Sequence, residues 1–275
     1  MTRKLNRQEV AKLGLYDFLG YIDAFDSPYI GGLDGTRSLI ERLGIQRNEN
    51  FHVLEVGCAS GFTSCMIAKE YGCQVTGIDI SEVLISKAQD RSDRMGLSNV
   101  RFQVADARHL PFDDDSFDAV FGVALVALIP KKEEVLQEFM RVTKPGGSIG
   151  TLDLFAKSDA KKEIVDSFSN TMKTLLEYDV AIMDFEKWRS IFEMLELDDI
   201  HVEANYNDVL LTTRPRSGTI KAIMKMLYHM VINGAVRKRM MKLMSLRKTA
   251  TMKDDEGFEH VGYLVFTGRK SNSLN

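Results

Sequence analysis

Acidic residues and glycines at the ends of expected strands are the groups in this sequence whose types and spacing could do chemistry. The stretch "VLEVGCASGFTS" predicts a strand, a glycine turn and a helix, with Glu55 near the strand end and Gly57 and Gly61 in the turn. Asp79 ends the next expected strand, and Asp106 ends the one after it. Because parallel strands present their carboxyl ends at one edge of a sheet, we expect these residues to surround one ligand.

The turn differs from the fingerprint Gly-x-Gly-x-x-Gly of dinucleotide-binding proteins. Counted from Gly57, that fingerprint needs glycine at the positions of Ala59 and Phe62. A pyrophosphate at the helix N-terminus would be repelled by the carboxylate of Glu55, whereas the ammonium group of an amino acid would not. A nucleoside joined to an amino acid is therefore favoured as the ligand, and a nicotinamide-dependent dehydrogenase is the less favoured alternative.

Two further acids suit the nucleoside part of such a ligand. Asp79 follows the turn by about twenty residues, where a carboxylate can accept both ribose hydroxyls. Asp106, with Ala107, stands where a side-chain oxygen can accept from an adenine amino group. The small residues Gly122 and Ala124 are expected at the carboxyl edge of the following strand, where they would leave room for the ligand.

The alternation of apolar strands and amphipathic helices predicts one elaborated α/β domain over residues 1–275. Strands are expected at 52–57, 74–79, 101–106, 117–123, 148–155, 200–206 and 262–270. Helices are expected at 61–71, 82–95, 131–142 and 184–195, after one or two within 7–30 and another at 36–44. Helical insertions at 157–180 and 207–258 are expected to cap the substrate. The stretch "KPGG" (144–147) is expected to end the helix before it.

Four segments, in this order, resemble the class I S-adenosylmethionine-dependent methyltransferases: "VLEVGCASG", "VTGIDIS", "VADARHLPFDDDSFDAV" and "VLQEFMRVTKPGG". The resemblance implies a Rossmann-like, doubly wound seven-stranded sheet of order 3-2-1-4-5-7-6 with the last strand antiparallel. It also implies S-adenosyl-L-methionine as the cofactor, with methionine at the turn, ribose at the second strand end and adenine at the third. The cofactor-binding residues would be Glu55, Gly57, Cys58, Ala59, Gly61, Asp79, Ile80, Asp106 and Ala107.

The turn departs from the family pattern at two positions. Glycine usually stands where this chain has Ala59, and threonine where it has Ser60. Alanine is expected to cost little unless the residue needs a positive φ, and Ser60 keeps the hydroxyl. A non-catalytic protein that only binds the cofactor is the alternative outside enzymes, and Ala59 is its sole support in the sequence.

The segment "SPYIGGLDGTRSLIERLGI" (27–45) resembles the lid segment of quinone and small-molecule methyltransferases of this class. By this resemblance, residues 1–45 form an N-terminal helical lid in which Tyr29 and Gly32 close over the sulfonium. The tyrosine would touch the cation through its ring face or its hydroxyl. The alternative is an amphipathic helix that starts after a glycine turn.

Methyl transfer from a sulfonium is an in-line displacement that needs a base only where the acceptor must lose a proton. The candidate bases are Asp153, His109 and His229, and none of them is assigned as catalytic. Asp153 would otherwise cap the helix of the insertion at 157–180. His109 would otherwise be an ordinary histidine of a surface loop.

The three cysteines, Cys58, Cys65 and Cys73, cluster in the turn, in the helix after it and at the exit of that helix. Enzymes that methylate arsenic use several thiols, but these positions favour small buried residues instead. Their odd number and close spacing also argue against a disulfide framework, and no metal site is expected.

The segment 214–253 is unusual in composition, with eleven Lys and Arg, no acid and seven of the 14 methionines. One helical stripe is expected to consist of Ile220, Ile223, Met224, Leu227, Met230 and Val231, and another face of Lys221, Lys225 and His229. Three interpretations stand: a cap over the substrate pocket, an amphipathic element at a membrane surface, and a packed helix pair with a solvated basic face.

Together these features predict methyl transfer to a small acceptor that is apolar, quinone-like or otherwise lipid-related. A methyltransferase for a polar amine or a macromolecule is the alternative. The N-terminal residues do not resemble a secretory signal, and no apolar run is long enough to span a bilayer. A cytoplasmic protein is therefore expected, with membrane contact through 214–253 as an addition. The net charge of −3 gives no indication of a nucleic-acid partner.

Overall fold

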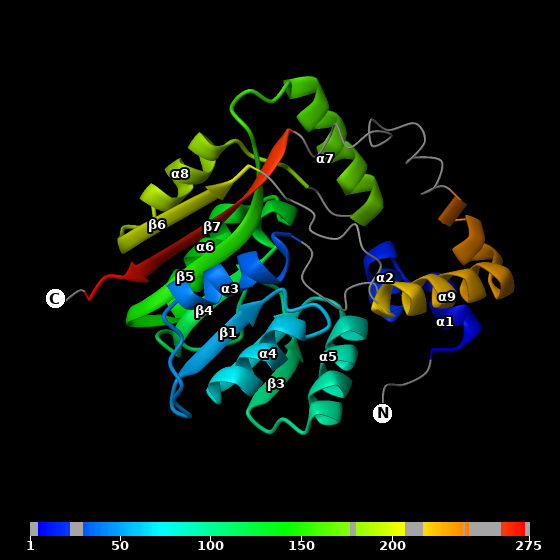
Figure 1. Cartoon of the computed structure of the whole chain (residues 1–275), viewed down its shortest axis with the longest axis horizontal. Coiled ribbons are helices and arrows are strands. Elements are labelled where there is room, and N and C mark those ends of the chain that lie inside the picture. The colour runs from blue at the N-terminus through cyan, green and yellow to red at the C-terminus, as the bar shows by residue number, and fades with distance from the viewer. Residues whose placement is uncertain are drawn as a thin grey trace.

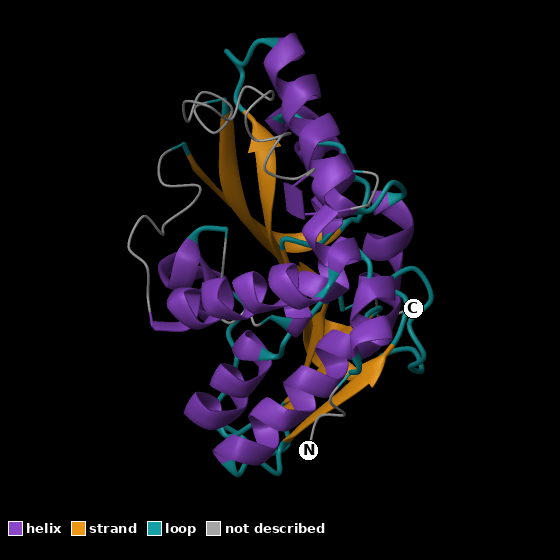
Figure 2. Ribbon diagram, turned by 90° about the vertical axis from the view of Figure 1, so that its right-hand side faces the viewer, coloured by secondary structure: helices purple, strands orange, loops and turns teal. Residues whose placement is uncertain are grey.

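Seven strands form one sheet in the order β3-β2-β1-β4-β5-β7-β6, as expected (Figure 1). The computed structural model describes residues 5–22, 30–176, 180–206, 217–238, 240–241 and 260–272. The strands are β1 His52–Val56, β2 Gln74–Asp79, β3 Val100–Val104, β4 Phe117–Val123, β5 Thr143–Ala156, β6 Leu197–Asn205 and β7 Val261–Lys270. The strands β1 to β5 pair with one another in parallel, whereas β7 runs antiparallel to both β5 and β6. The strands twist strongly from one end of the sheet to the other (Figure 2).

Most element boundaries agree with the sequence pattern, and β5 is the main exception. The "KPGG" stretch ends the preceding helix at Val142, but the chain continues directly as a strand from Thr143. Thr143 pairs with Phe117, and the register then shifts before Ala119 pairs with Ser148. This irregularity, with Gly146 at a φ of +73°, accommodates the extra residues. Proline and glycine therefore end the helix without ending regular structure.

The helices cover both faces of the sheet. One face carries α3 Gly32–Arg42, α4 Phe62–Tyr71 and α5 Glu82–Met95, and the other carries α6 Lys132–Val142 and α8 Phe185–Glu193. Strand residues alternate between two cores, so that Val53 packs with α3 and α4 whereas Leu54 packs with α6 and α8. A helix expected at 36–44 begins earlier because Gly31, at a φ of +63°, serves as the N-cap of α3.

Helices far apart in the sequence form a separate unit beside the sheet. Helices α1 Arg7–Lys12, α2 Leu15–Tyr21 and α9 Ser217–Ile232 lie together in Figure 1, beyond α5. Their small core includes Val10, Phe18, Ile22, Val236 and Met240. The unit reaches the sheet through α2, where Gly20 packs so closely on Leu84 of α5 that a Cβ would lie 2.3 Å from its Cδ2.

The residues of the apolar stripe expected for α9 do not all face the same surroundings. Met230 faces the small core and is half-buried, whereas Met224, Leu227 and Val231 are exposed on the opposite side. The side chains of Ile220, Ile223, Lys221 and Lys225 lie outside the described residues. Helix α9 ends at Ile232, and Asn233 Oδ1 accepts hydrogen bonds from the amides of Ala235 and Val236.

The insertion expected as one helix over 157–180 contains α7, Lys162–Leu176. Phe168 of this helix packs on Leu154 of β5 and Val261 of β7, together with Ile30 and Ile182. Both Leu154 and Val261 lie near the end of the sheet where β5 finishes. Helix α7 thus covers the carboxyl end of β5 with apolar side chains.

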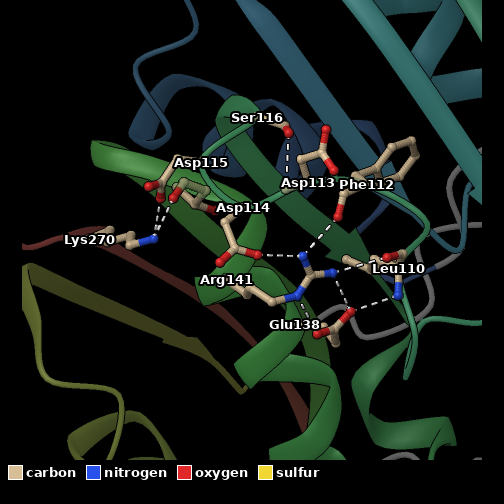
Figure 3. Close-up of polar contacts among 10 residues, drawn as sticks. Leu110, Phe112, Asp113, Asp114, Asp115, Ser116, Glu138, Arg141 and Lys270 are labelled. Carbon is tan, nitrogen blue, oxygen red and sulfur yellow. Dashed lines mark hydrogen bonds and ion pairs between the residues drawn. The ribbon is translucent and has the colours of Figure 1, made fainter.

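A hydrogen-bond network around Arg141 of α6 fixes the loop between β3 and β4 (Figure 3). Its guanidinium donates to the carbonyls of Leu110 and Phe112 and to the carboxylates of Glu138 and Asp114, at 2.7–3.0 Å. Glu138 also accepts from the Leu110 amide at 2.7 Å, and Arg141 holds the pKa of Glu138 below its usual range. The loop that follows Asp106 is therefore fastened to α6.

Replacing Arg141 by methionine should lower the free energy of unfolding by about 2 kcal/mol, because loop carbonyls and Glu138 lose a charged donor. Urea denaturation of the two proteins measures this difference. Arg189→Met is the matched control, because the described ion pairs of Arg189 join it to exposed Glu186 and Glu193 on its own helix, and it should change the free energy of unfolding far less. Equal effects of the two changes would contradict the account.

Candidate functional site

The glycine turn joins β1 to α4 through two glycines in the left-handed region. Gly57 has a φ of +74° and Gly61 a φ of +72°. A Cβ on Gly61 would lie 2.7 Å from the Cβ of Ala88 and 2.8 Å from Cζ of Phe102, so this position has neither the backbone conformation nor the space for another residue. The amides of Gly57 and Cys58 both donate to the carbonyl of Ile78 at 2.8 Å, which ties the turn to β2.

Ala59 adopts a positive φ of +47°, so the condition under which alanine was expected to cost little is not met. A left-handed conformation costs a residue with a Cβ about 1–2 kcal/mol. The conformation persists because the Ala59 amide donates to Oδ2 of Asp79 at 2.9 Å. The residue that departs from the family pattern is therefore strained and is held in place by a buried acid.

Asp79, at the end of β2, is 4% exposed and connects three parts of the chain. Its Oδ2 accepts from the Ala59 amide and, at 3.2 Å, from the hydroxyl of Tyr16 in α2, and its Oδ1 accepts from the Ser81 amide at 3.0 Å. Burial raises the pKa of this carboxyl. Since each carboxylate oxygen has two lone pairs, only Oδ1 retains one for a further donor. As arranged, Asp79 can accept one ribose hydroxyl rather than the expected two.

The N-terminal helix α2 is fastened to this strand end at a second point. The hydroxyl of Ser81, which caps α5, donates to Oδ1 of Asp17. Neither Tyr16 nor Asp17 was predicted from the sequence, because the pattern of residues 7–30 indicates helices but not the strand end that they meet. The lid residue that was predicted, Tyr29, lies outside the described residues.

Glu55 lies beneath the turn and is 3% exposed. It accepts a hydrogen bond from the hydroxyl of Ser64 in α4, and burial raises its pKa to about 8. The carboxyl is therefore largely protonated at neutral pH. A neutral Glu55 would not repel a phosphate, so the expected charge repulsion at this turn does not by itself identify the ligand.

Ile80, expected at the ribose, directly follows β2, and Asp106 and Ala107, expected at adenine, follow β3. Ile80 follows Asp79 with 55% of its surface exposed, which is high for an isoleucine and leaves an apolar side chain at the sheet edge. Ala107 is buried. Asp106 forms an ion pair with Arg108, whose Nη2 lies 2.6 Å from Oδ2 and which lowers the pKa of Asp106. A donor on a ligand would have to share Asp106 with this guanidinium.

The room expected beside Gly122 is filled by Leu125. A Cβ on Gly122 would lie 3.1 Å from Leu125 Cδ2, and a Cβ on Gly57 would lie 2.8 Å from Leu125 Cδ1. Leu125 follows Ala124, whose positive φ of +53° turns the chain back after β4. Its half-buried side chain therefore packs directly on the glycine turn, an arrangement that sequence spacing does not reveal.

Asp153 is fully buried and holds the turn after β4 in place. It accepts from the amides of Val126 and Ala127, both at 3.1 Å, and from the hydroxyl of Thr151 at 2.6 Å. Burial raises its pKa to about 6. Lys132, also buried, donates to the carbonyl of Ala127 at 3.3 Å. Asp153 thus caps the short 3-10 helix η1, Val126–Leu128, and not the insertion at 157–180 for which a cap was expected.

The remaining candidate residues are His109, His229 and Gly32. His109 is exposed in the loop after β3. His229 packs edge-to-face on Phe18 and Tyr21, with ring centroids 6.2 and 5.2 Å apart, so it faces the small helical core rather than a basic surface. Gly32 opens α3 and is buried, and its neighbour Gly31 lies so close to Tyr263 that a Cβ would approach the ring to 3.0 Å.

All three cysteines are buried free thiols. Burial raises the pKa of Cys65 and Cys73 to about 11 and that of Cys58 well above its ordinary value, which leaves them protonated and unreactive. The interpretation of these cysteines as small buried residues is confirmed. Within the described ranges, no group of three or more His, Cys, Asp or Glu side chains is placed to hold a metal ion.

The chain is similar to proteins that transfer methyl groups. The model of a family described as "Methyltransferase domain" matches residues 47–203, more than half of the chain. Methyltransferase GfsG of Streptomyces halstedii is 30% identical over 68% of this chain and 71% of its own. Phosphatidylethanolamine N-methyltransferase of Cereibacter sphaeroides is 34% identical over 44% of this chain and 61% of its own. An uncharacterized Haemophilus influenzae protein, 32% identical, is matched over 59% of this chain and 64% of its own.

A solved structure shares the fold over almost the whole chain. Phosphoethanolamine N-methyltransferase 2 of Haemonchus contortus, in complex with S-adenosyl-L-methionine, superposes with a TM-score of 0.68 at 19% identity. The superposition covers 98% of this chain and 60% of that one. At this identity the likeness concerns the fold alone.

Replacing Ala59 by glycine should raise the free energy of unfolding by about 0.5–1 kcal/mol, because relief of the left-handed strain exceeds the entropy cost of glycine. The Ala59 amide and its bond to Asp79 are retained. Urea denaturation measures the change. Ala68→Gly, inside α4, is the control and should instead destabilise by about 1 kcal/mol. Destabilisation by both changes would show that Ala59 is not strained.

Replacing Glu55 by glutamine should remove a pH dependence of stability. Because the folded state raises the Glu55 pKa from 4.5 to about 8, its stabilising contribution is complete below the unfolded pKa and is lost as the pH rises through 8. In urea denaturation without ligand, the free energy of unfolding of Glu55→Gln should rise relative to that of the wild type between pH 5 and 8.5, by up to a few kcal/mol. Glu49→Gln, at an exposed position, is the control, and its free energy of unfolding should vary with pH as that of the wild type does. Parallel curves for all three proteins would contradict the buried neutral state of Glu55.

Proposed function

Because the chain belongs to the class I S-adenosylmethionine-dependent methyltransferases, we propose that it methylates a small apolar or lipid-like acceptor by in-line displacement. The single observation that carries the choice of acceptor is the apolar character of the carboxyl ends of β4 and β5. Half-buried apolar side chains lie at the end of β4, in the loop after it and in the segment before α8, namely Val123, Leu125, Leu128, Ile129, Ile182 and Met183. Of these, Leu125, Ile129 and Met183 pack against the same core. The amide of Ala181 donates to the carbonyl of Ala127 and joins the two segments.

We assign the cofactor site to the edge formed by the glycine turn and the ends of β2 and β3. Left-handed Gly57 and Gly61 let the backbone approach the methionine part closely, and the free lone pair on Asp79 Oδ1 can accept one ribose hydroxyl. Exposed Ile80 offers an apolar surface to the adenine ring. When bound, the cofactor supplies the reactive methyl group on its sulfonium.

The chain's own contribution to catalysis would be alignment and exclusion of water rather than proton transfer. Asp153 is occupied by two amides and a hydroxyl, and in that position it fixes the turn that carries Leu125 and Leu128. Correct alignment of two reactants is worth roughly 7–11 kcal/mol of activation free energy. An acceptor that reacts without losing a proton to a protein base fits this arrangement.

A polar amine is the second candidate acceptor. Two similar proteins are named for N-methylation of ethanolamine headgroups, one on a phospholipid and one on a free phosphoethanolamine. The phospholipid case combines both candidates, because its acceptor is an amine carried by an apolar molecule. An acceptor panel must therefore vary the amine and the apolar part separately.

Transfer of tritium from methyl-labelled S-adenosylmethionine should be measured to quinol, sterol and phospholipid acceptors in mixed micelles and to water-soluble amines. We expect turnover only with apolar acceptors. Leu125→Ala should lower kcat/KM about tenfold or more for such an acceptor, since it removes an apolar side chain that packs directly on the glycine turn. Met194→Ala, at an exposed site beyond α8, is the control. Turnover of soluble amines, with every apolar acceptor inactive, would contradict the proposal.

A further inference from the structure

Helix α9 is apolar on two opposite faces, and only one of them is covered in the described part of the chain. Its inner face places Met226 and Met230 against the small core formed with α1 and α2. Its outer face carries Met224, Leu227, Tyr228 and Val231, which are 63%, 48%, 60% and 76% exposed. Their spacing of three and four residues puts all four on one side of the helix. The apolar face of an amphipathic helix normally packs against another surface, so the outer face calls for a covering surface.

This outer face concentrates exposed apolar side chains that are scattered elsewhere. Of the eleven large exposed apolar residues in the described ranges, five lie between residues 224 and 241, the fifth being Met241. The others stand on separate elements, as Met95 at the end of α5 and Ile200 in β6 do. Single exposed apolar residues are ordinary on protein surfaces, whereas a contiguous group marks an interaction site.

The charge beside this face indicates what covers it. Arg237 and Lys238 are exposed on the helical stretch that follows Asn233, a few residues before Met241. The surrounding segment 214–253 has eleven Lys and Arg and no acid, although the whole chain has a net charge of −3. A second copy of the chain would bring the same positive charge to the contact, which disfavours self-association. Apolar side chains flanked by cations, with a tyrosine among them, suit an anionic lipid surface.

We propose that the outer face of α9, with Arg237, Lys238 and Met241, docks on an anionic lipid surface. The helices do not need to cross the bilayer, and no described helix is long and apolar enough to do so. The bound helix would lie along the surface with its four exposed apolar side chains among the lipids. Docking would keep the inner face of α9 on α2, whose Tyr16 contacts Asp79 at the cofactor site.

The consequence for substrate delivery rests on the proposed function. If the acceptor is lipid-soluble, docking through α9 places the carboxyl edge of the sheet near the membrane where that acceptor is dissolved. Docking itself does not depend on the reaction. A binding assay without cofactor or acceptor therefore tests this inference separately from methyl transfer.

The test is sedimentation of the full chain with vesicles of phosphatidylcholine alone or with about one third phosphatidylglycerol. The wild type should sediment with anionic vesicles and be released by high salt, because its charge contacts are screened. Leu227→Ser with Val231→Ser should weaken binding about tenfold, since two side chains lose their transfer into lipid. Arg237→Glu with Lys238→Glu should abolish the preference for anionic vesicles while retaining the apolar face. Met194→Ser with Ile200→Ser, at exposed sites just beyond α8 and on β6, is the matched control and should bind as the wild type does.

Three results would overturn the inference. The first is failure of the wild type to sediment with anionic vesicles at low salt. The second is vesicle binding that the α9 variants leave unchanged. The third is a concentration-dependent dimer of the free protein, in analytical ultracentrifugation, that Leu227→Ser with Val231→Ser abolishes, because it would show that a second copy covers this face. Circular dichroism and cofactor affinity of the variants verify that each remains folded.

Discussion

The buried carboxylate of Asp79 is the interaction on which the candidate site depends. One oxygen accepts from the strained Ala59 and from Tyr16, and the other accepts from the amide that begins α5. The glycine turn, the N-terminal helices and the second crossover helix are thereby fixed to the end of a single strand. Since α9 packs on the same N-terminal helices, its position relative to the sheet also depends on this contact.

Two other buried acids near the carboxyl edge of the sheet also accept hydrogen bonds from neighbouring segments. Asp153 of β5 binds two amides of the turn after β4, and Glu55 of β1 binds the hydroxyl of Ser64 in α4. A buried acid is costly unless backbone or hydroxyl donors satisfy it, so each one fixes the loop that supplies those donors. Acids that the sequence marks as chemical candidates therefore have an architectural role, and α2 contacts this edge at Asp79 and Ser81.

Much of the fold could be predicted because the signals are local. Short apolar runs locate β2 and β4, and the Ser81 N-cap with Gly96 beyond the C-terminus delimits α5. The features that were missed arise from contacts between distant segments. Tyr16 meets Asp79 across 63 positions, Leu125 folds back on Gly57, and the exposed face of α9 depends on which side packs against α1 and α2. The positive φ of Ala59 likewise depends on Asp79 and not on its neighbours in the sequence.

The central claim is that this edge holds S-adenosylmethionine through Asp79. Calorimetric titration of S-adenosylmethionine, its demethylated product and NAD into the wild type and Asp79→Ala tests it most directly. The account predicts that both sulfur nucleosides bind the wild type, that NAD does not, and that Asp79→Ala weakens binding about tenfold or more through loss of a charged acceptor. Binding of NAD, or an affinity for S-adenosylmethionine that Asp79→Ala leaves unchanged, would contradict it.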